Sequence, residues 1–471
     1  MRPARLEEIG IRGSAVVAIL RRVTGNVGVA DLRLVDWGTA AAEERHRILA
    51  RGGDHAGVGE GLRSAIADIV EDVRSRGDAA LVDALGGFDK MNLPVEGLRV
   101  SEEEFDAARA AVSEPLVEAI RTSIAQVRAF NELIVQRASW TARPRPGLVV
   151  GEQAAAIPSV GLYVPSGKGS FPSVLIQIAT PAVVAGVDRI VVMVAPVPGG
   201  AGQVDPATLV AARELGLTEV YRSNGPAGIA ALASGTETVA KVRKIVGPGS
   251  PAVTCAQLEV QRLGCVVEVG FGPTDALIVA DDSADLRWLA ADLINEAEHG
   301  ADSSAVLVST SRAVLEGVRE HVAQQVAELP EPRRTYARTS IAVNGGLVFA
   351  SSREEAMEVA NAYAPEHLQL AVADPEEWLP LARYAGTVLL GQWTTFAASN
   401  FAIGTPATLP TTGFAQVSSG VTASTYLVRA AVAHVDESEF RRLAPVVTAL
   451  AHHEGFPAHA ATVTVRQPDN A

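Results

Sequence analysis

Strands and helices alternate along most of the chain from about residue 145 onward. Short apolar runs such as 189–197 and 304–310 are typical of buried strands, and amphipathic segments such as 283–299 and 312–329 lie between such runs. Because a strand–helix–strand unit places its two strands parallel, this order predicts parallel sheets covered by helices. Two such series follow one another and predict an α/β protein with two Rossmann-like domains.

The remaining regions have a different character. Ser101 precedes three glutamates, a helix-start pattern that predicts two long helices over 101–138. The region before residue 140 is therefore expected to be helical. The last segment, from about residue 424, is expected to be helical and to end in a strand over 461–465.

Charge and composition exclude several classes of protein. The chain has 471 residues and a formal net charge of −14. An acidic chain is disfavoured as a binder of nucleic acid or of an anionic membrane surface. The two cysteines, Cys255 and Cys265, are too few for a disulfide framework. No apolar run approaches a membrane span, so we expect a cytoplasmic enzyme.

An acid and an imidazole stand side by side at Glu366 and His367, behind Pro365 and before a strand-like run. A carboxylate and an imidazole have different ordinary pKa values, so together they supply two proton-transfer groups at one point. A solvated surface loop also commonly carries such a pair, and spacing alone does not separate the two interpretations.

A second candidate site lies at the end of the amphipathic segment 286–299. Glu296 and His299 are three residues apart and project from one side of the expected helix. A Glu-x-x-His pair on a helix is a recurrent metal-ligating arrangement. Alternatively, His299 stabilises the helix C-terminus beside Gly300, and Glu296 lies on the surface.

Ordered motifs over roughly residues 33–466 resemble the histidinol dehydrogenase family. They are 361–368 (NAYAPEHL), 163–167 (YVPSG), 245–250 (IVGPGS), 296–300 (EAEHG), 398–411 (ASNFAIGTPATLPT) and 454–459 (EGFPAH). The resemblance implies a homodimer in which a C-terminal tail crosses to the partner subunit. The domains expected on this basis are an N-terminal extension (1–32), the helical part of the first domain (33–140), the second Rossmann-like domain (141–275), the first Rossmann-like domain (276–415) and the dimerisation tail (416–471).

The same resemblance implies a zinc site. Its ligands correspond to Glu296, His299, Asn400 and His459, the last arriving on the tail of the partner subunit. The family has glutamine and aspartate where this chain has Glu296 and Asn400, so the formal charge of the ligand set is unchanged. Oxygen and imidazole donors suit zinc. We therefore expect the metal to be retained, and the alternative is that Asn400 marks a site without metal.

Family members carry out two successive NAD-dependent oxidations, from alcohol through aldehyde to carboxylate. Carried onto this chain, His367 takes the proton of the substrate hydroxyl and Glu366 activates water. The substrate-binding positions correspond to Ser173, Thr274, Phe401, Ala407 and Glu454, with Glu454 supplied by the partner subunit.

Nucleotide binding rests on the α/β pattern and the resemblance, because the chain has no G-x-G-x-x-G fingerprint and residues 166–170 resemble a P-loop only superficially. The cofactor-binding positions correspond to Tyr163, Pro165, Gly225, Gly247, Pro248 and Gly249. Ser250 and Gln257 replace an asparagine and a lysine of the family. The differences from the family sequence therefore cluster around the expected nucleotide site.

The residues of the expected substrate pocket also differ from those of the family. Pro406 and Ala407 replace a family Asn-His pair, which favours a small polar amino alcohol or diol, such as the sulfonated propanediol used in one branch of the family, over histidinol. Two alternatives stay open: a true L-histidinol dehydrogenase of histidine biosynthesis, and a binding homologue without catalysis.

Overall fold

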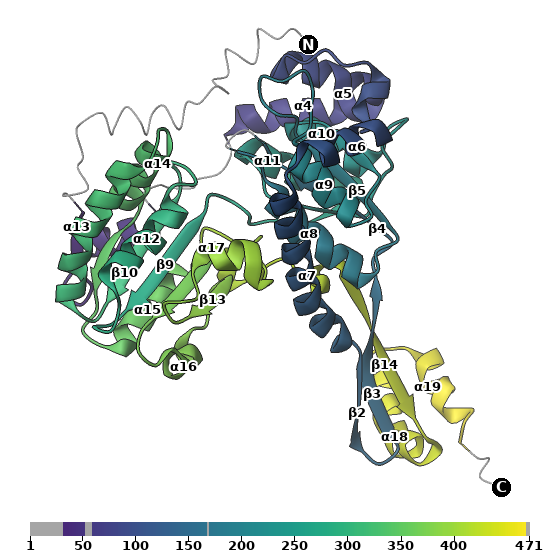
Figure 1. Ribbon diagram of the computed structural model, residues 1–471. Helices are drawn as coiled ribbons and strands as arrows, with labels where there is room; N and C mark the ends of the chain where they lie inside the picture. The colour runs from purple at the N-terminus through teal and green to yellow at the C-terminus, as the bar shows by residue number, and fades with distance from the viewer. Residues whose placement is uncertain (1–31, 52–58, 167–168, 468–471) are drawn as a thin grey trace.

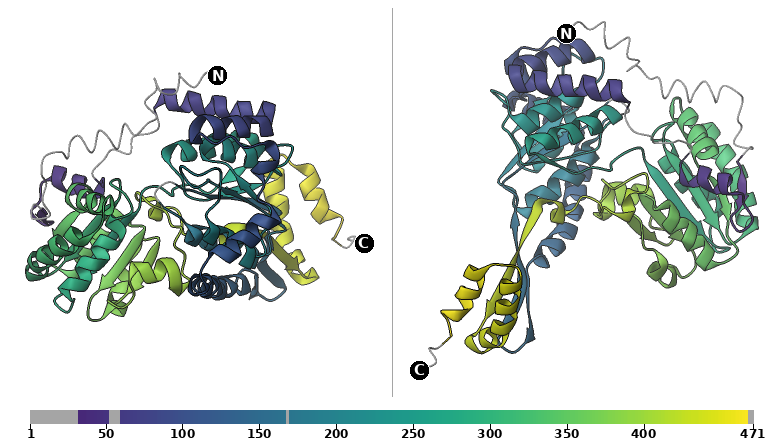
Figure 2. Two further views of the ribbon diagram at one scale, coloured as in Figure 1. Left: turned by 45° about the horizontal axis from the view of Figure 1, so that its top comes forward. Right: turned by 180° about the vertical axis from the view of Figure 1, so that it is seen from behind.

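The computed structural model describes residues 32–51, 59–166 and 169–467. In these ranges the chain forms two α/β bodies and a slender arm, each built around its own sheet (Figure 1). Figure 2 shows the same separation from two other sides. Apart from Leu32, the predicted N-terminal extension lies outside the described residues.

The first body contains a six-stranded parallel sheet. Its strands are β1 (Leu34–Asp36), β9 (Asp275–Ala280), β10 (Ser304–Ser309), β11 (Gly346–Phe349), β12 (His367–Ala371) and β13 (Thr387–Leu390), and its helices are α3 (Ala42–Leu49), α12 (Leu286–Ala297), α13 (Arg312–Glu328), α14 (Arg333–Thr339), α15 (Arg353–Tyr363), α16 (Pro375–Trp378) and α17 (Phe396–Ala398). Ala276 and Ile278 of β9 face the core beneath α12 and α13. Leu277, between them, faces a second core beneath α15. Both faces of the sheet are therefore buried, as the continuous apolar strands predict.

The second body contains a five-stranded parallel sheet. Its strands are β4 (Ser159–Val164), β5 (Arg189–Val194), β6 (Val220–Arg222), β7 (Lys244–Val246) and β8 (Val266–Val267), and its helices are α4 (Glu60–Arg76), α5 (Asp78–Ala84), α6 (Glu102–Ala111), α7 (Glu114–Gln136), α8 (Pro172–Ala185), α9 (Pro206–Glu214), α10 (Gly225–Ser234) and α11 (Pro251–Val260). Helices α7, α8 and α9 share one core with the sheet, and α4, α5, α10 and α11 share the other. The two helices expected over 101–138 are confirmed as α6 and α7, and Ser101 forms a capping box with Glu104.

The expected grouping of residues 33–140 with the first domain is only partly right. Strand β1 and helix α3 belong to the six-stranded sheet, but α4 to α7 pack on the five-stranded sheet. The apolar face of α7, with Val117 and Ile120, is buried against α8 and α9. The periodicity of these helices predicts a buried face but not which sheet covers it.

The two sheets share one strand order. From edge to edge, β11-β10-β9-β12-β13 and β6-β5-β4-β7-β8 both run third, second, first, fourth, fifth in chain order. This is the Rossmann-like order, in which the direction of winding reverses between the first and fourth strands. Two Rossmann-like sheets are therefore confirmed, and β1 adds one further edge strand to the first.

The arm is an antiparallel sheet of β2 (Trp140–Arg145), β3 (Leu148–Ala156) and β14 (Leu427–Val435), followed by α18 (Glu437–His453) and α19 (Pro457–Thr464). It projects away from both bodies (Figure 1). Its base is anchored where the buried Tyr426 hydroxyl donates to the carbonyl of Ile178 on α8, at 2.7 Å. The strand predicted over 461–465 is wrong, because Pro457 starts a helix and Thr462 bonds back to the carbonyl of His459.

None of the helices in the described part of the chain combines the length and the apolarity needed to cross a bilayer.

Candidate active site

Glu366 and His367 lie at the amino end of β12, which runs between β9 and the edge strand β13 of the six-stranded sheet. Helix α15 ends at Tyr363, and Ala364 turns the chain with a left-handed φ of 49°. Only 7% of Glu366 and 2% of His367 are exposed, so the pair is not a solvated surface dipeptide. The interpretation of this pair as a surface loop is thereby excluded.

Helix α12 brings Glu296 and His299 to the same place. Glu296 Oε2 lies 3.9 Å from His367 Nδ1 and 3.8 Å from His299 Nδ1. Glu366 Oε2 lies 3.9 Å from the same nitrogen of His367. Glu296 is buried, so it is not the surface glutamate of the alternative interpretation.

Asn400 completes this cluster from the segment that follows α17. Its amide donates to Glu296 Oε1 at 3.3 Å, beside a second donor, Asn295, at 2.7 Å. The two positions at which this chain departs from the family ligand set are therefore in direct contact. Both donors reach Oε1, which leaves the other oxygen of Glu296 facing the imidazoles.

Burial and neighbouring charge set the proton affinities here. Burial, together with the carboxylates of Glu296 and Asp275, holds the pKa of Glu366 well above its ordinary value. Burial lowers the pKa of the His367 imidazole, and the nearby carboxylate of Glu296 only partly opposes that shift. The pKa values of these two adjacent side chains are therefore shifted in opposite directions, as is common in acid–base sites.

The cluster contains buried polar atoms without hydrogen-bond partners among the described residues, which is one feature expected of a site for a divalent cation. Glu296 Oε2 is buried and has no hydrogen-bond partner, and neither ring nitrogen of His367 has one. An unpartnered buried carboxylate oxygen is costly unless a cation or another donor reaches it. Across the described ranges, however, no group of three or more His, Cys, Asp or Glu side chains is placed to hold a metal.

The fourth predicted ligand, His459, is not part of this cluster. It belongs to α19, near the end of the arm, and both Figure 1 and Figure 2 show α19 far from α12. Glu454, which caps the end of α18, lies on the same arm. One chain thus brings together Glu296, His299 and Asn400 and leaves His459 and Glu454 apart.

The other predicted substrate residues lie on segments that adjoin those of the cluster in sequence or through contacts of their neighbours. Phe401 and Ala407 follow Asn400, and the Ala407 N–H donates to Gln177 Oε1 of α8 at 3.2 Å. Ser173 lies one turn earlier on that helix. Thr274 directly precedes β9, whose first residue contacts Glu366. The predicted substrate residues therefore come from both bodies, Ser173 from the five-stranded body and Thr274 from the six-stranded body.

The predicted nucleotide positions meet at the carboxyl edge of the five-stranded sheet. Tyr163 lies near the end of β4 and Pro165 directly follows that strand, and Gly247, Pro248 and Gly249 follow β7. In a Rossmann-like sheet, this is the crevice where the winding reverses.

Contacts within this crevice join Gly225 to the same group. The Tyr163 hydroxyl accepts from the Gly225 N–H at 3.0 Å and donates to Asn224 at 3.3 Å. A side chain at residue 247 would collide with the Tyr163 carbonyl, since a Cβ there would lie 2.1 Å from its oxygen. Gly247 is thus required by the close approach of β4 and β7.

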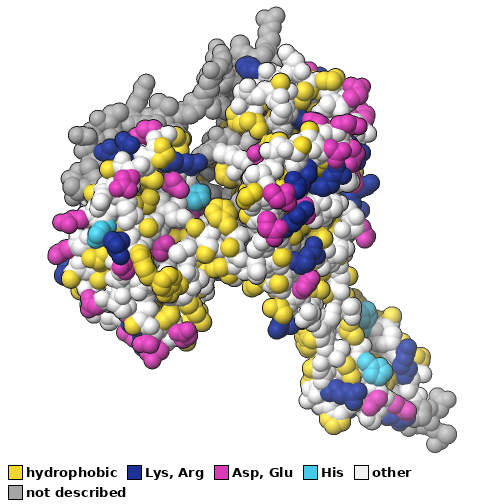
Figure 3. Space-filling model, in the orientation of Figure 1, with side chains coloured by type: hydrophobic (Ala, Val, Ile, Leu, Met, Phe, Trp, Pro, Cys, Tyr) yellow, Lys and Arg dark blue, Asp and Glu magenta, His cyan; other side chains and the backbone are white. Residues whose placement is uncertain are grey.

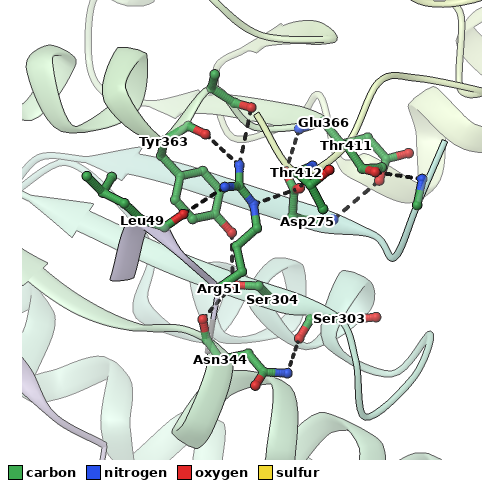
Figure 4. A network of polar contacts seen from close by, with 12 residues as sticks. Leu49, Arg51, Asp275, Ser303, Ser304, Asn344, Tyr363, Glu366, Thr411 and Thr412 are labelled. Carbon is green, nitrogen blue, oxygen red and sulfur yellow. Dashed lines mark hydrogen bonds and ion pairs between the residues drawn. The ribbon is translucent and has the colours of Figure 1, made fainter. Parts of the chain in front are cut away.

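Asp275 and Arg51 are buried charged neighbours of Glu366 that the sequence analysis did not identify. Asp275 accepts from the Glu366 N–H at 2.7 Å and pairs with Arg51 Nε at 2.8 Å (Figure 4). An acid as the first residue of an otherwise apolar buried strand was a usable signal for Asp275. Arg51 carries no comparable local signal.

We compared the sequence and the fold of this chain with those of known proteins. The sequence profile of histidinol dehydrogenase matches residues 56–467. The chain belongs to the histidinol dehydrogenase family. It is similar to histidinol dehydrogenase of Methanosarcina barkeri, at 36% identity over 90% of this chain and 95% of that protein. It is also similar to histidinol dehydrogenase homolog 2 of Mesorhizobium japonicum, at 38% identity over 92% of this chain and 97% of the relative.

A solved structure gives the same result. The crystal structure of histidinol dehydrogenase from Elizabethkingia anophelis superposes with a TM-score of 0.86 at 30% identity, covering 93% of this chain and 98% of the other. The resemblance seen in the motifs is thus confirmed. Members of this family are oxidoreductases that generally use NAD and zinc, oxidise in two steps and act as dimers.

Proposed function

We propose that this protein is a zinc- and NAD-dependent dehydrogenase that oxidises a small polar primary alcohol to a carboxylate through a bound aldehyde. The observation that carries the proposal is the buried Glu366–His367 couple, in which His367 Nδ1 faces the carboxylates of Glu296 and Glu366 at 3.9 Å and neither ring nitrogen makes a hydrogen bond of normal geometry. NAD would accept the hydride in each oxidation, and zinc would polarise the substrate oxygen.

His367 acts in the first oxidation. Its lowered pKa keeps the ring neutral near pH 7, so a ring nitrogen can take the proton of the substrate hydroxyl while the carbon loses hydride. One C–H and one O–H bond break, and the C=O bond of the aldehyde forms. Because neither nitrogen makes a hydrogen bond of normal geometry within the chain, the ring is available for this transfer.

Glu366 acts in the second oxidation. A carboxylate whose pKa is raised is a stronger base, and Glu366 Oε2 lies beside the imidazole that held the first proton. Glu366 takes a proton from water as the oxygen adds to the aldehyde carbon. The hydrate then loses hydride and a proton, which gives the carboxylate.

Zinc would be held by Glu296, His299 and Asn400, with His459 of the partner subunit as the fourth donor. The arm supports such an exchange, because Val428, Val432, Leu450 and Phe456 are exposed on it. Figure 3 shows hydrophobic side chains along the arm and where the two bodies meet. Exposed apolar patches of this kind mark interaction surfaces.

A mixing experiment tests the exchanged arm. His367→Ala and His459→Ala are each expected to be inactive, but dissociation and reassociation of the two together should restore activity. In a mixed dimer with exchanged arms, one site carries both substitutions and the other carries neither. No recovery, with mixed dimers verified by mass, contradicts the exchange.

The substrate is proposed to be a small amino alcohol or diol rather than histidinol, because Pro406 and Ala407 replace the family Asn-His pair. The relatives named histidinol dehydrogenase support histidinol as the second candidate. NADH absorbance with a panel of alcohols, histidinol included, decides between them. If the zinc-loaded protein forms no NADH with any alcohol, a binding homologue without catalysis is the better description.

A further inference from the structure

Asp275 contacts Glu366 twice (Figure 4). Its carboxylate oxygen Oδ1 accepts from the backbone N–H of Glu366 at 2.7 Å. In return, the backbone N–H of Asp275 donates to Glu366 Oε2 at 3.3 Å. One contact holds the backbone of Glu366 and the other holds its reactive carboxylate, so residue 275 sets both the position and the direction of that group.

Arg51 holds Asp275 in turn. Its Nε lies 2.8 Å from Asp275 Oδ2, and the two side chains are 7% and 1% exposed. The guanidinium also donates to the carbonyl of Tyr363 and lies 3.9 Å above the ring of that residue. A buried arginine therefore joins the start of β9 to the end of α15.

The turn between these contacts is strained. Ala364 adopts a left-handed φ of 49°, which residues other than glycine rarely adopt. Such a conformation persists where surrounding contacts hold it, and Arg51 donates to the carbonyls on both sides of this turn, those of Tyr363 and Ala364. Asp275 Oδ2 also accepts from the N–H of Thr412 at 2.6 Å, which ties in the segment after the predicted pocket.

We infer that Asp275, held by Arg51, is a positioning residue that aims the Glu366 carboxylate at the water molecule used in the second oxidation. This inference rests on the proposed function. Loss of the Arg51–Asp275 pair should therefore slow the second oxidation more than the first. A pair that only stabilised the fold would affect both oxidations alike.

The first test is Asp275→Asn, which keeps the side-chain size and removes the charge that pairs with Arg51. The kcat for oxidation of the aldehyde should fall about 10²-fold, the scale of a misplacement near 1 Å. The first NADH formed from the alcohol, followed by stopped flow in a single turnover of the same preparation, should appear nearly as fast as in the wild type, because that hydride leaves before Glu366 acts on water. The KM for the aldehyde should change little. Arg51→Lys should recover part of the loss seen in Arg51→Met, because it keeps the cation.

Glu104→Gln is the matched control. Glu104 pairs with Arg222, another buried arginine, which also donates to the carbonyls of Gly202 and Gly97 at 2.8 and 2.6 Å. This pair lies in the five-stranded body. Its loss should leave the ratio of the two oxidations unchanged, whatever it does to the melting temperature.

Amide hydrogen exchange provides a readout that needs no activity. In Asp275→Asn, a peptide covering 363–368 should lose protection, because the Glu366 N–H loses its charged acceptor, while peptides from β4 keep theirs. Unchanged exchange at 363–368, or an equal fall in both oxidations, overturns the inference. If the wild-type protein oxidises neither alcohol nor aldehyde, the proposed function fails instead, and the exchange result still decides whether Asp275 holds Glu366.

Discussion

The two Rossmann-like sheets have the same strand order, but the residues proposed to act in catalysis and in nucleotide binding lie at opposite edges. The five-stranded sheet gathers Tyr163, Gly225 and Gly247 at its carboxyl edge. The six-stranded sheet gathers Glu366 and His367 at its amino edge. Strand order alone therefore does not decide which edge of a sheet is used.

The reason lies in the residues at each crevice. At the carboxyl edge of the six-stranded sheet, Asp281 fills the corresponding position and accepts from the N–H groups of Ser283 and Ala373, both at 3.0 Å. A negatively charged carboxylate at this position would repel the phosphates of a nucleotide. At the carboxyl edge of the five-stranded sheet, glycine and proline leave the backbone open to an anionic nucleotide, and the carboxylate of Asp89 accepts from the Asn224 amide at 2.7 Å.

The largest effect is expected at the amino edge of the six-stranded sheet. His367→Ala should lower turnover about 10²–10⁴-fold, the range for a positioned acid–base group. Affinity for NADH, measured by fluorescence titration, should stay unchanged because the proposed nucleotide site lies on the other sheet. Wild-type turnover in this variant would contradict the role of His367.

Glu366→Gln should separate the two oxidations. Water must lose a proton only in the second, so oxidation of added aldehyde should fall about 10²-fold or more, and oxidation of the alcohol less. Stopped-flow measurement of NADH formation from each substrate checks this. Unimpaired oxidation of aldehyde would remove Glu366 from the water-activating step.

Stability should depend on pH through Asp292, which burial holds at a pKa of about 6 despite the hydrogen bond from Gln369. Between its ordinary pKa of about 4 and 6, the folded state binds more protons than the unfolded state. The free energy of unfolding should therefore fall as pH rises through this window, by about 1–2 kcal/mol after allowance for solvent relaxation. Urea unfolding of Asp292→Asn should lack this component, and identical pH profiles would contradict the assignment.

The smallest effect is expected at the nucleotide edge. Tyr163→Phe removes the hydroxyl that accepts from Gly225 and donates to Asn224, so NADH should bind about 5–10-fold more weakly. The matched change on the other sheet, Asp281→Asn, should leave NADH affinity as it is. If both variants bind NADH equally, the assignment of the nucleotide to the five-stranded sheet loses its support.

Much of the fold follows from local pattern. The alternation of strands and helices, the capping box at Ser101 and the amphipathic face that carries Glu296 and His299 depend on residues a few positions apart, and a single sequence displays them. The ordered motifs over roughly residues 33–466, with the one around Glu366 and His367 among them, were sufficient to place the chain in its family. The strand expected over 461–465 failed because Pro457 begins a helix there.

Tertiary structure decided what joins distant segments. Arg51 and Asp275 are 224 residues apart, and Asp275 and Glu366 are 91 apart, so no periodicity relates them. The assignment of α4 to α7 to the five-stranded sheet, the contact of Asn400 with Glu296 and the separation of His459 from the cluster also depend on such long-range packing. Sequence determined which chemical groups this protein carries, whereas the folded chain decided which of them meet, because a contact between remote segments depends on the packing of everything between them.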